Sequence, residues 1–203
     1  MFDAPDLASH IAPLLAASER APSSDFDLNT DTKPDLTYRD AAVLVPLIFE
    51  HDHWKVILTK RPATMKHHPG QVAFPGGKKD PSDADLQSTA AREACEEIGI
   101  SAGSINWLGQ LPKHQTITGF EVSPFVAVLE TGQSLTPEQY EVEEVFTVPL
   151  AHFSRSKFRK EGRVWAGATR YYYSVPYGPY YIWGATARIL LSLALVLEQT
   201  DAH

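Results

Sequence analysis

One stretch of nine consecutive apolar residues, 41–49 (AAVLVPLIF), constrains the fold of this chain more than any other. An apolar run of this length without polar alternation predicts a buried strand at the centre of a sheet. Residues 51–53 follow as a turn, and residues 54–59 (WKVILT) predict a second strand. The fold is therefore expected to be built around this pair of strands.

The rest of the chain alternates between strand and helix patterns, which predicts an α/β sandwich. Gly99 marks the end of one helix, because glycine is a common C-terminal stop. The further predicted elements are strands at 105–111, 120–129 and 142–148, a tyrosine-rich hairpin at 163–175, and helices at 83–98 and 182–199.

The N-terminal region predicts a short helix followed by a linker. Residues 5–18 place Leu7, Ile11, Leu14 and Leu15 on one helical face. Residues 20–36 are rich in Asp, Pro, Ser and Thr, a composition typical of linkers. We expect residues 1–37 to form this helix and linker, and residues 38–203 to form the catalytic domain.

The net charge of −7 bears on the partners of the chain. Nucleic-acid binding depends on cationic patches that neutralise phosphates, so a nucleic-acid partner is not expected. An anionic small molecule would need a local source of positive charge. That source must be a cluster of basic side chains or a metal ion.

Compartment and membrane signals are few. Cys95 is the single cysteine, which excludes an intrachain disulfide and fits a reducing cytoplasm. The N-terminus has no basic segment typical of a signal peptide. The longest apolar stretch, 182–197, contains Arg188 and is shorter than the ~20 residues that span a bilayer. A cytoplasmic protein without a membrane span is expected.

Three carboxylates share one face of the predicted helix at 83–98. Glu93, Glu96 and Glu97 stand at positions i, i+3 and i+4, where like charges repel by a few tenths of a kcal/mol per pair. A hard dication such as Mg²⁺ or Mn²⁺ prefers oxygen ligands and would reverse that cost. The simpler alternative is a solvated acidic face. Asp83 or Asp85 is a candidate N-cap.

The segment 92–100 (REACEEIGI) resembles the Nudix box, G-x5-E-x7-R-E-U-x-E-E-x-G-U, in which U is aliphatic. The glycine pair Gly76-Gly77 precedes it, but Arg92 follows Gly77 by 15 residues where the general motif has 14. Ala84 therefore stands where the motif has its first Glu. Asp83 or Asp85 is expected to take over the role of that residue, which is to pair with the arginine.

A second segment resembles the coenzyme A pyrophosphatase branch of the Nudix family. Residues 58–61 (LTKR) and 65–77 (MKHHPGQVAFPGG) match its signature, and the longer box loop is common in that branch. Pro62 and Lys66 depart from the signature, which has a small residue and Arg at these positions. Only Arg forms a rigid bidentate fork with phosphate. Together with further short matches, the resemblance covers residues 41–197.

The resemblance implies a Nudix-type α/β/α sandwich with a central mixed sheet and a catalytic strand-loop-helix motif. It implies Mg²⁺- or Mn²⁺-dependent hydrolysis of the diphosphate of CoA or acyl-CoA, giving 4′-phosphopantetheine and adenosine 3′,5′-bisphosphate. The implied catalytic residues are Arg92, Glu93, Glu96 and Glu97; the implied metal ligands are Glu93, Glu96, Glu97 and the Gly77 carbonyl; the implied substrate-binding residues are Arg61, Lys66, Gly76, Gly77 and Lys78.

Several alternatives stay open on the sequence alone. Another nucleoside diphosphate derivative, such as ADP-ribose or NADH, is the rival substrate, and a non-catalytic nucleotide-binding Nudix module is the rival class. Glu121, Glu143 and Glu144 are the candidate catalytic bases. The aromatic side chains between residues 165 and 181 are expected to pack the hairpin or form a homodimer surface.

Overall fold

The computed structural model describes residues 6–16, 21–29, 36–65, 67–165 and 167–200. A mixed nine-stranded sheet has the strand order β1-β7-β8-β2-β3-β4, with β5 on β2, β6 on β8 and β9 on β3. Its strands are β1 Ser23–Ser24, β2 Arg39–Glu50, β3 His53–Lys60, β4 Val72–Ala73, β5 Gly76–Lys78, β6 Ile105–Gln110, β7 His114–Gln115, β8 Phe120–Leu129 and β9 Glu144–Pro149.

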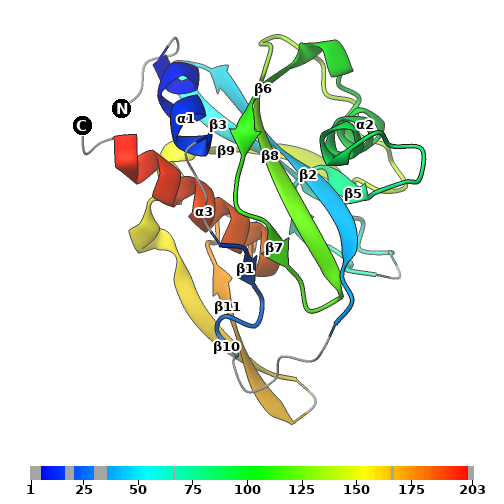
Figure 1. The fold of residues 1–203 in the computed structure, drawn as a ribbon, viewed down its shortest axis with the longest axis vertical. Helices are drawn as coiled ribbons and strands as arrows, with labels where there is room; N and C mark the ends of the chain where they lie inside the picture. Colours follow the sequence, from blue (N-terminus) through cyan, green and yellow to red (C-terminus); the bar gives the residue numbers. More distant parts are fainter. Residues whose placement is uncertain (1–5, 17–20, 30–35, 66, 166, 201–203) are drawn as a thin grey trace.

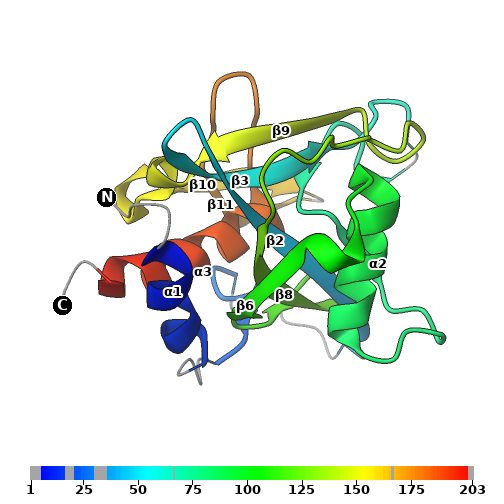
Figure 2. The same cartoon turned by 90° about the horizontal axis from the view of Figure 1, so that it is seen from above.

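Helices cover both faces of this sheet. Helix α2 (Leu86–Ile98) lies on one face, whereas α1 (Asp6–Ala16) and α3 (Gly184–Thr200) lie on the other (Figures 1 and 2). Short 3-10 helices occur at Ala102–Ser104, Leu150–Phe153 and Arg155–Lys157. The predicted α/β/α sandwich with a mixed sheet is confirmed.

The predicted central strand is β2. It pairs in parallel with β8 and antiparallel with β3. Ala42, Leu44 and Val45 have no exposed surface, because helices cover both faces of the strand here. Continuous apolar character is expected of a strand in this position.

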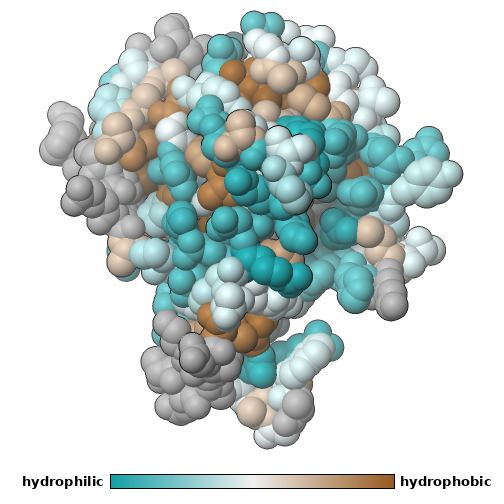
Figure 3. All heavy atoms as spheres, turned by 45° about the vertical axis from the view of Figure 1, so that its right-hand side comes forward, coloured by the Kyte–Doolittle hydropathy of each residue, from teal (hydrophilic) through white to brown (hydrophobic). Residues whose placement is uncertain are grey.

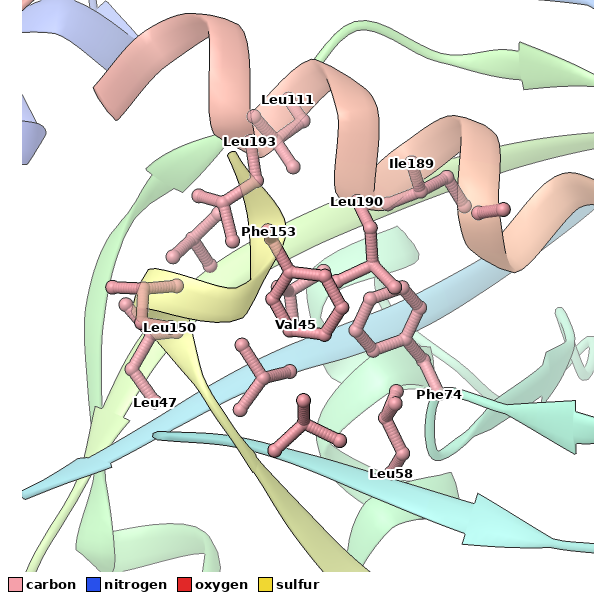
Figure 4. Packing of buried hydrophobic residues seen from close by; sticks show 14 of the residues in the cluster. Val45, Leu47, Leu58, Phe74, Leu111, Leu150, Phe153, Ile189, Leu190 and Leu193 are labelled. Carbon is pink, nitrogen blue, oxygen red and sulfur yellow. The ribbon is translucent and has the colours of Figure 1, made fainter. Parts of the chain in front are cut away.

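The main core lies between the sheet and α3. Leu190 and Leu193 of α3 point toward Phe153 and the strand residues Val45 and Leu47 (Figure 4). Full burial of one such side chain stabilises the fold by roughly 1.5–3 kcal/mol. Within the described residues, no helix is long and apolar enough to cross a membrane.

Helix α1 belongs to this same core. Leu7, Ile11 and Leu15 are buried in the cluster that contains the α3 side chains. A Cβ at Gly109 of β6 would lie 2.7 Å from the Cβ of Leu15, so a glycine permits the close approach of α1. Gly109 also has a φ of 151° and follows an irregularity in the pairing of β6 with β8.

The prediction of a linker at residues 20–36 is wrong for residues 21–29, the part of it next to the sheet that the structure describes. Ser23 and Ser24 form β1, which pairs in parallel with β7. The fully buried ring of His114 bonds to Ser23 Oγ at 2.9 Å and to Asp25 Oδ1 at 3.0 Å. A buried imidazole needs such partners, and they fix this segment to the sheet.

The predicted C-terminal hairpin exists but begins earlier than expected. Strand β10 (Arg159–Trp165) pairs antiparallel with β11 (Ala168–Ser174) as a separate two-stranded sheet. The first residues, Arg159 to Gly162, lack the apolar alternation that marks a strand. Pairing with β11 extends β10 over them.

Candidate active site on helix α2 and the glycine loop

Both ends of α2 are set by its own sequence. The Asp85 carboxylate accepts a hydrogen bond of 2.7 Å from the N–H of Ser88, which caps the N-terminus. Gly99, with a φ of 72°, ends the helix in the left-handed conformation and bonds back to the carbonyl of Cys95. The helix therefore starts at Leu86, three residues after the predicted start.

Small residues bring α2 close to the sheet. Ala90, Ala94 and Ile98 are fully buried, and α2 packs against β2 and β5. Because these residues recur every four positions, Glu93 and Glu97 lie beside them, toward the loop that carries the glycine pair. The face that anchors the helix thus also places two carboxylates at that loop.

Glu97 is a buried carboxyl group, with 4% of its surface exposed. Burial raises its pKa to about 8, although the N–H of Gly76 donates a hydrogen bond of 3.1 Å to Oε2. The neighbouring Glu93 raises the pKa further, whereas Arg61 opposes the rise. A cation beside Glu97 would favour its ionised form.

The glycine pair is required by steric contacts. A Cβ at Gly77 would lie 2.5 Å from Oε1 of Glu93, and one at Gly76 would lie 2.4 Å from the carbonyl oxygen of Ala42. Real Cβ atoms do not approach this closely. The close contact between Gly77 and Glu93 thus depends on the absence of a side chain on the loop.

Arg92 pairs with Asp83, one of the two aspartates between which the sequence did not decide. Its Nε and one terminal nitrogen donate to the two carboxylate oxygens of Asp83, at 2.9 and 3.1 Å. Asp83 also accepts from the N–H of Asp80 and the hydroxyl of Thr89. The Arg92 guanidinium is the main reason that the Asp83 pKa lies far below its usual range. Asp83 is the arginine partner and Asp85 is the cap.

Arg92 also contacts the catalytic candidates. It donates to Oε1 of Glu93 and to Oε2 of Glu96, both at 2.9 Å. Burial raises the pKa of Glu93, and Arg92 opposes that rise. The Glu96 side chain is 59% exposed, so it lies at the outer edge of the cluster, away from Glu97. Among the residues that the structure describes, no preformed group of three His, Cys, Asp or Glu side chains surrounds a metal position.

The predicted substrate-binding cations differ in their placement. Arg61 acts electrostatically on Glu97, and its Nε is buried with no hydrogen-bond partner among the described residues. Lys78 is exposed, and Lys66 lies outside the described residues. The ammonium of Lys60 pairs with Glu143 at 2.8 Å. Arg61 is therefore the basic side chain of this loop that the structure places at the carboxylates.

The candidate bases named from the sequence are engaged elsewhere. Glu143 pairs with Lys60, and Glu121 pairs with Lys113 at 2.7 Å. Glu144 accepts a hydrogen bond of 2.5 Å from the hydroxyl of Tyr180.

The structure instead brings Glu141 to the site, since its charge raises the pKa of both Glu93 and Glu97. Its loop is tied to the end of α2, where the N–H of Glu138 donates to the carbonyl of Glu97 at 2.9 Å. Glu141 is distant from α2 in sequence and belongs to no motif, so no sequence signal identifies it.

Comparisons with known proteins identify the family of this chain. The family model described as NUDIX domain matches residues 37–166. The uncharacterized Nudix hydrolase NudL of Pectobacterium atrosepticum is 38% identical over 180 residues, covering 85% of this chain and 90% of the relative. NudL of Photorhabdus laumondii is 40% identical over 157 residues, covering 77% and 83%. The solved Nudix hydrolase RenU of M. smegmatis has 22% identity and a TM-score of 0.48, covering 57% and 73%.

The chain thus belongs to the Nudix family of hydrolases. It is a pyrophosphatase, and membership of this family supports a nucleoside diphosphate derivative as its substrate. Nudix hydrolases generally use divalent metal ions.

Proposed function

We propose that this chain hydrolyses the diphosphate of CoA and acyl-CoA, giving adenosine 3′,5′-bisphosphate and 4′-phosphopantetheine, which keeps its acyl group when the substrate is an acyl-CoA. The observation that carries the proposal is Arg61. It belongs to the LTKR segment that resembles the CoA pyrophosphatase signature, acts on the Glu97 carboxylate and has an Nε with no hydrogen-bond partner among the described residues. A guanidinium in this position is suited to a diphosphate, because it binds phosphate oxygens as a fork.

The donor set fits Mg²⁺ or Mn²⁺. Glu93, Glu97 and the Gly77 carbonyl would hold the ion, with help from Glu96, and all of these groups supply oxygen, the ligand atom of hard dications. The raised pKa values of Glu93 and Glu97 support this assignment, because an ion would compensate their burial. When bound, the ion would neutralise the diphosphate and lower the pKa of a bound water.

The remaining side chains orient and bind. Asp83 and Arg92 fix Glu93 through the bidentate ion pair. Arg61 binds the diphosphate, and the exposed Lys78 adds positive charge at the entrance. Glu141 is exposed and not ion-paired within the described residues, and it takes the proton of the attacking water.

The 3′-phosphate distinguishes CoA from other diphosphates. We propose that Lys66 or Arg61 contacts it, since an added dianion needs a cationic partner. The single cysteine favours the cytoplasm as the compartment of the reaction.

The test is hydrolysis by the purified chain with Mn²⁺, using CoA, acetyl-CoA, ADP-ribose and NADH at equal concentration. We expect CoA or acetyl-CoA to have the highest kcat/KM, with the two named products identified by chromatography. A preference for ADP-ribose or NADH would reject the CoA assignment within the family. Binding of nucleotides without turnover of any substrate would indicate a non-catalytic module.

A further inference from the structure

The hairpin β10–β11, which we call the arm, projects from the body of the molecule, and its root packs against α3. It forms the lower end in Figures 1 and 3; its two strands pair with each other, and at the root Ser174 also forms an isolated bridge with Trp183. An isolated two-stranded hairpin is marginally stable in water. Its persistence as an extension therefore needs an explanation.

The root of the arm is fixed by a polar network. Glu161 accepts hydrogen bonds from the hydroxyls of Ser174, at 2.9 Å, and Tyr181, and the Tyr181 hydroxyl lies 3.0 Å from that of Tyr172. The side chain of Asn29 bonds to both the N–H and the carbonyl of Tyr171 at 2.8 Å. These contacts hold the root in one orientation and leave the tip projecting, a preorganised element for contact with a partner.

The arm and the residues that lead into it concentrate positive charge. Residues 155–170 hold six of the 18 basic residues and one of the 25 acidic residues, a net charge of +5, which leaves −12 on the rest of a chain of net charge −7. Within the described residues, none of the six forms an ion pair. The six are Arg155, Lys157, Arg159, Lys160, Arg163 and Arg170.

The tip combines these charges with apolar surface. Val164 is 69% exposed and Trp165 is 62% exposed. Arg163 and Arg170 stand directly opposite each other across the strands, where like charges are unfavourable, and Nε of Arg170 is buried with no partner in the described structure. Trp and Arg are the residues most often found at the centre of protein interfaces.

We propose that the arm joins two copies of this chain, each arm docking on the acidic body of the other copy. The net charge of −12 on the rest of the chain is complementary to the +5 of residues 155–170, and the same negative charge repels a nucleic acid. A reciprocal contact of this kind closes as a two-fold dimer. The proposal holds whichever nucleoside diphosphate the active site hydrolyses.

The test is sedimentation velocity of the full chain and four variants at about 0.1 M and about 1 M salt, where charges are screened beyond ~10 Å and ~3 Å respectively. We expect a dimer of the wild type that weakens at high salt. Arg163→Glu and Trp165→Ser should each raise the dimer Kd at least tenfold. Arg39→Glu and Tyr140→Ser, which alter an exposed arginine and an 86% exposed tyrosine outside the arm, should not raise the dimer Kd.

Three results would overturn the proposal. A monomeric wild type at low salt, or arm variants that dimerise like the wild type, would remove the role of the arm. A dimer that tightens with salt would place arm against arm, because salt screens the repulsion between like charges. Melting temperatures of all five proteins exclude unfolding as the cause, and CoA hydrolysis measured in parallel keeps the outcome separate from that of the proposed function.

Discussion

The two faces of the central sheet bury different kinds of side chain. On the α3 face, fully buried aliphatic side chains such as Leu190 and Leu193 form the main core cluster. On the α2 face, alanines bring the helix close, and Glu97 is buried beside Glu93. Both faces bury apolar side chains, but the α2 face also holds carboxylates out of water at a cost in stability. Substitutions on the two faces should therefore separate stability from activity.

The largest expected effect is on catalysis, from the α2 face. Glu97→Gln should lower kcat for CoA by at least about 10²-fold while the fold stays intact, because it removes the charge of a proposed metal ligand or base. Initial rates and circular dichroism measure the two parts. Glu130→Gln, at an exposed glutamate outside the site, is the matched control. Activity of Glu97→Gln within a few-fold of the wild type would move the catalytic role elsewhere, first to Glu141 and then to Glu144 or Glu121.

The α3 face should show the opposite result. Leu193→Ala is expected to lower the free energy of unfolding by roughly 2–5 kcal/mol, since it leaves a cavity at a fully buried position. The kcat of the folded fraction should stay near the wild-type value. Urea denaturation measures the loss, and Ile117→Ala, at a 40% exposed site, should change stability by less than about 0.5 kcal/mol. A large fall in kcat with unchanged stability would contradict the division between the faces.

The pH dependence of stability sharpens the comparison. The pKa of Glu97 is raised to about 8 in the folded chain, so without metal the folded state holds a proton that the unfolded chain releases above its ordinary pKa. The contribution of Glu97 to the free energy of unfolding should be complete below about pH 4.5 and should fall by a few kcal/mol up to about pH 8. In EDTA, the Tm of Glu97→Gln should therefore depend on pH much less than the Tm of the wild type over this range. The account is contradicted if the variant and the wild type lose Tm equally over this range.

The smallest expected effect concerns the substrate. A charge-assisted contact with the 3′-phosphate is worth about 1.5–3 kcal/mol, so CoA should have a kcat/KM at least about tenfold above that of dephospho-CoA. Lys66→Ala should lower the ratio of kcat/KM for CoA to kcat/KM for dephospho-CoA. Lys78→Ala is the control for a general loss of positive charge at the site. Equal rates for CoA and dephospho-CoA would mean that the 3′-phosphate is not recognised.

Regular periodic segments could be predicted from the sequence, and contacts between distant residues could not. Strand β8 spans the predicted residues 120–129, because its apolar pattern is set by burial in the sheet. Strand β1 has only two residues and depends on the distant His114, and Glu141 reaches the site through a loop. The sequence also left open whether Asp83 or Asp85 pairs with Arg92, a choice made by side-chain geometry in three dimensions.

The most direct test of the α2 face is the change in Tm that Mn²⁺ causes in the wild type, Glu93→Gln, Glu97→Gln and the Glu130→Gln control. A ligand that binds only the folded state stabilises it, by about 2.7 kcal/mol at about 100 times its Kd. The account predicts a rise in Tm for the wild type and the control, and a much smaller rise for Glu93→Gln and Glu97→Gln. A full wild-type rise in both of these variants would show that the carboxylates on α2 form a solvated acidic surface and do not bind the metal.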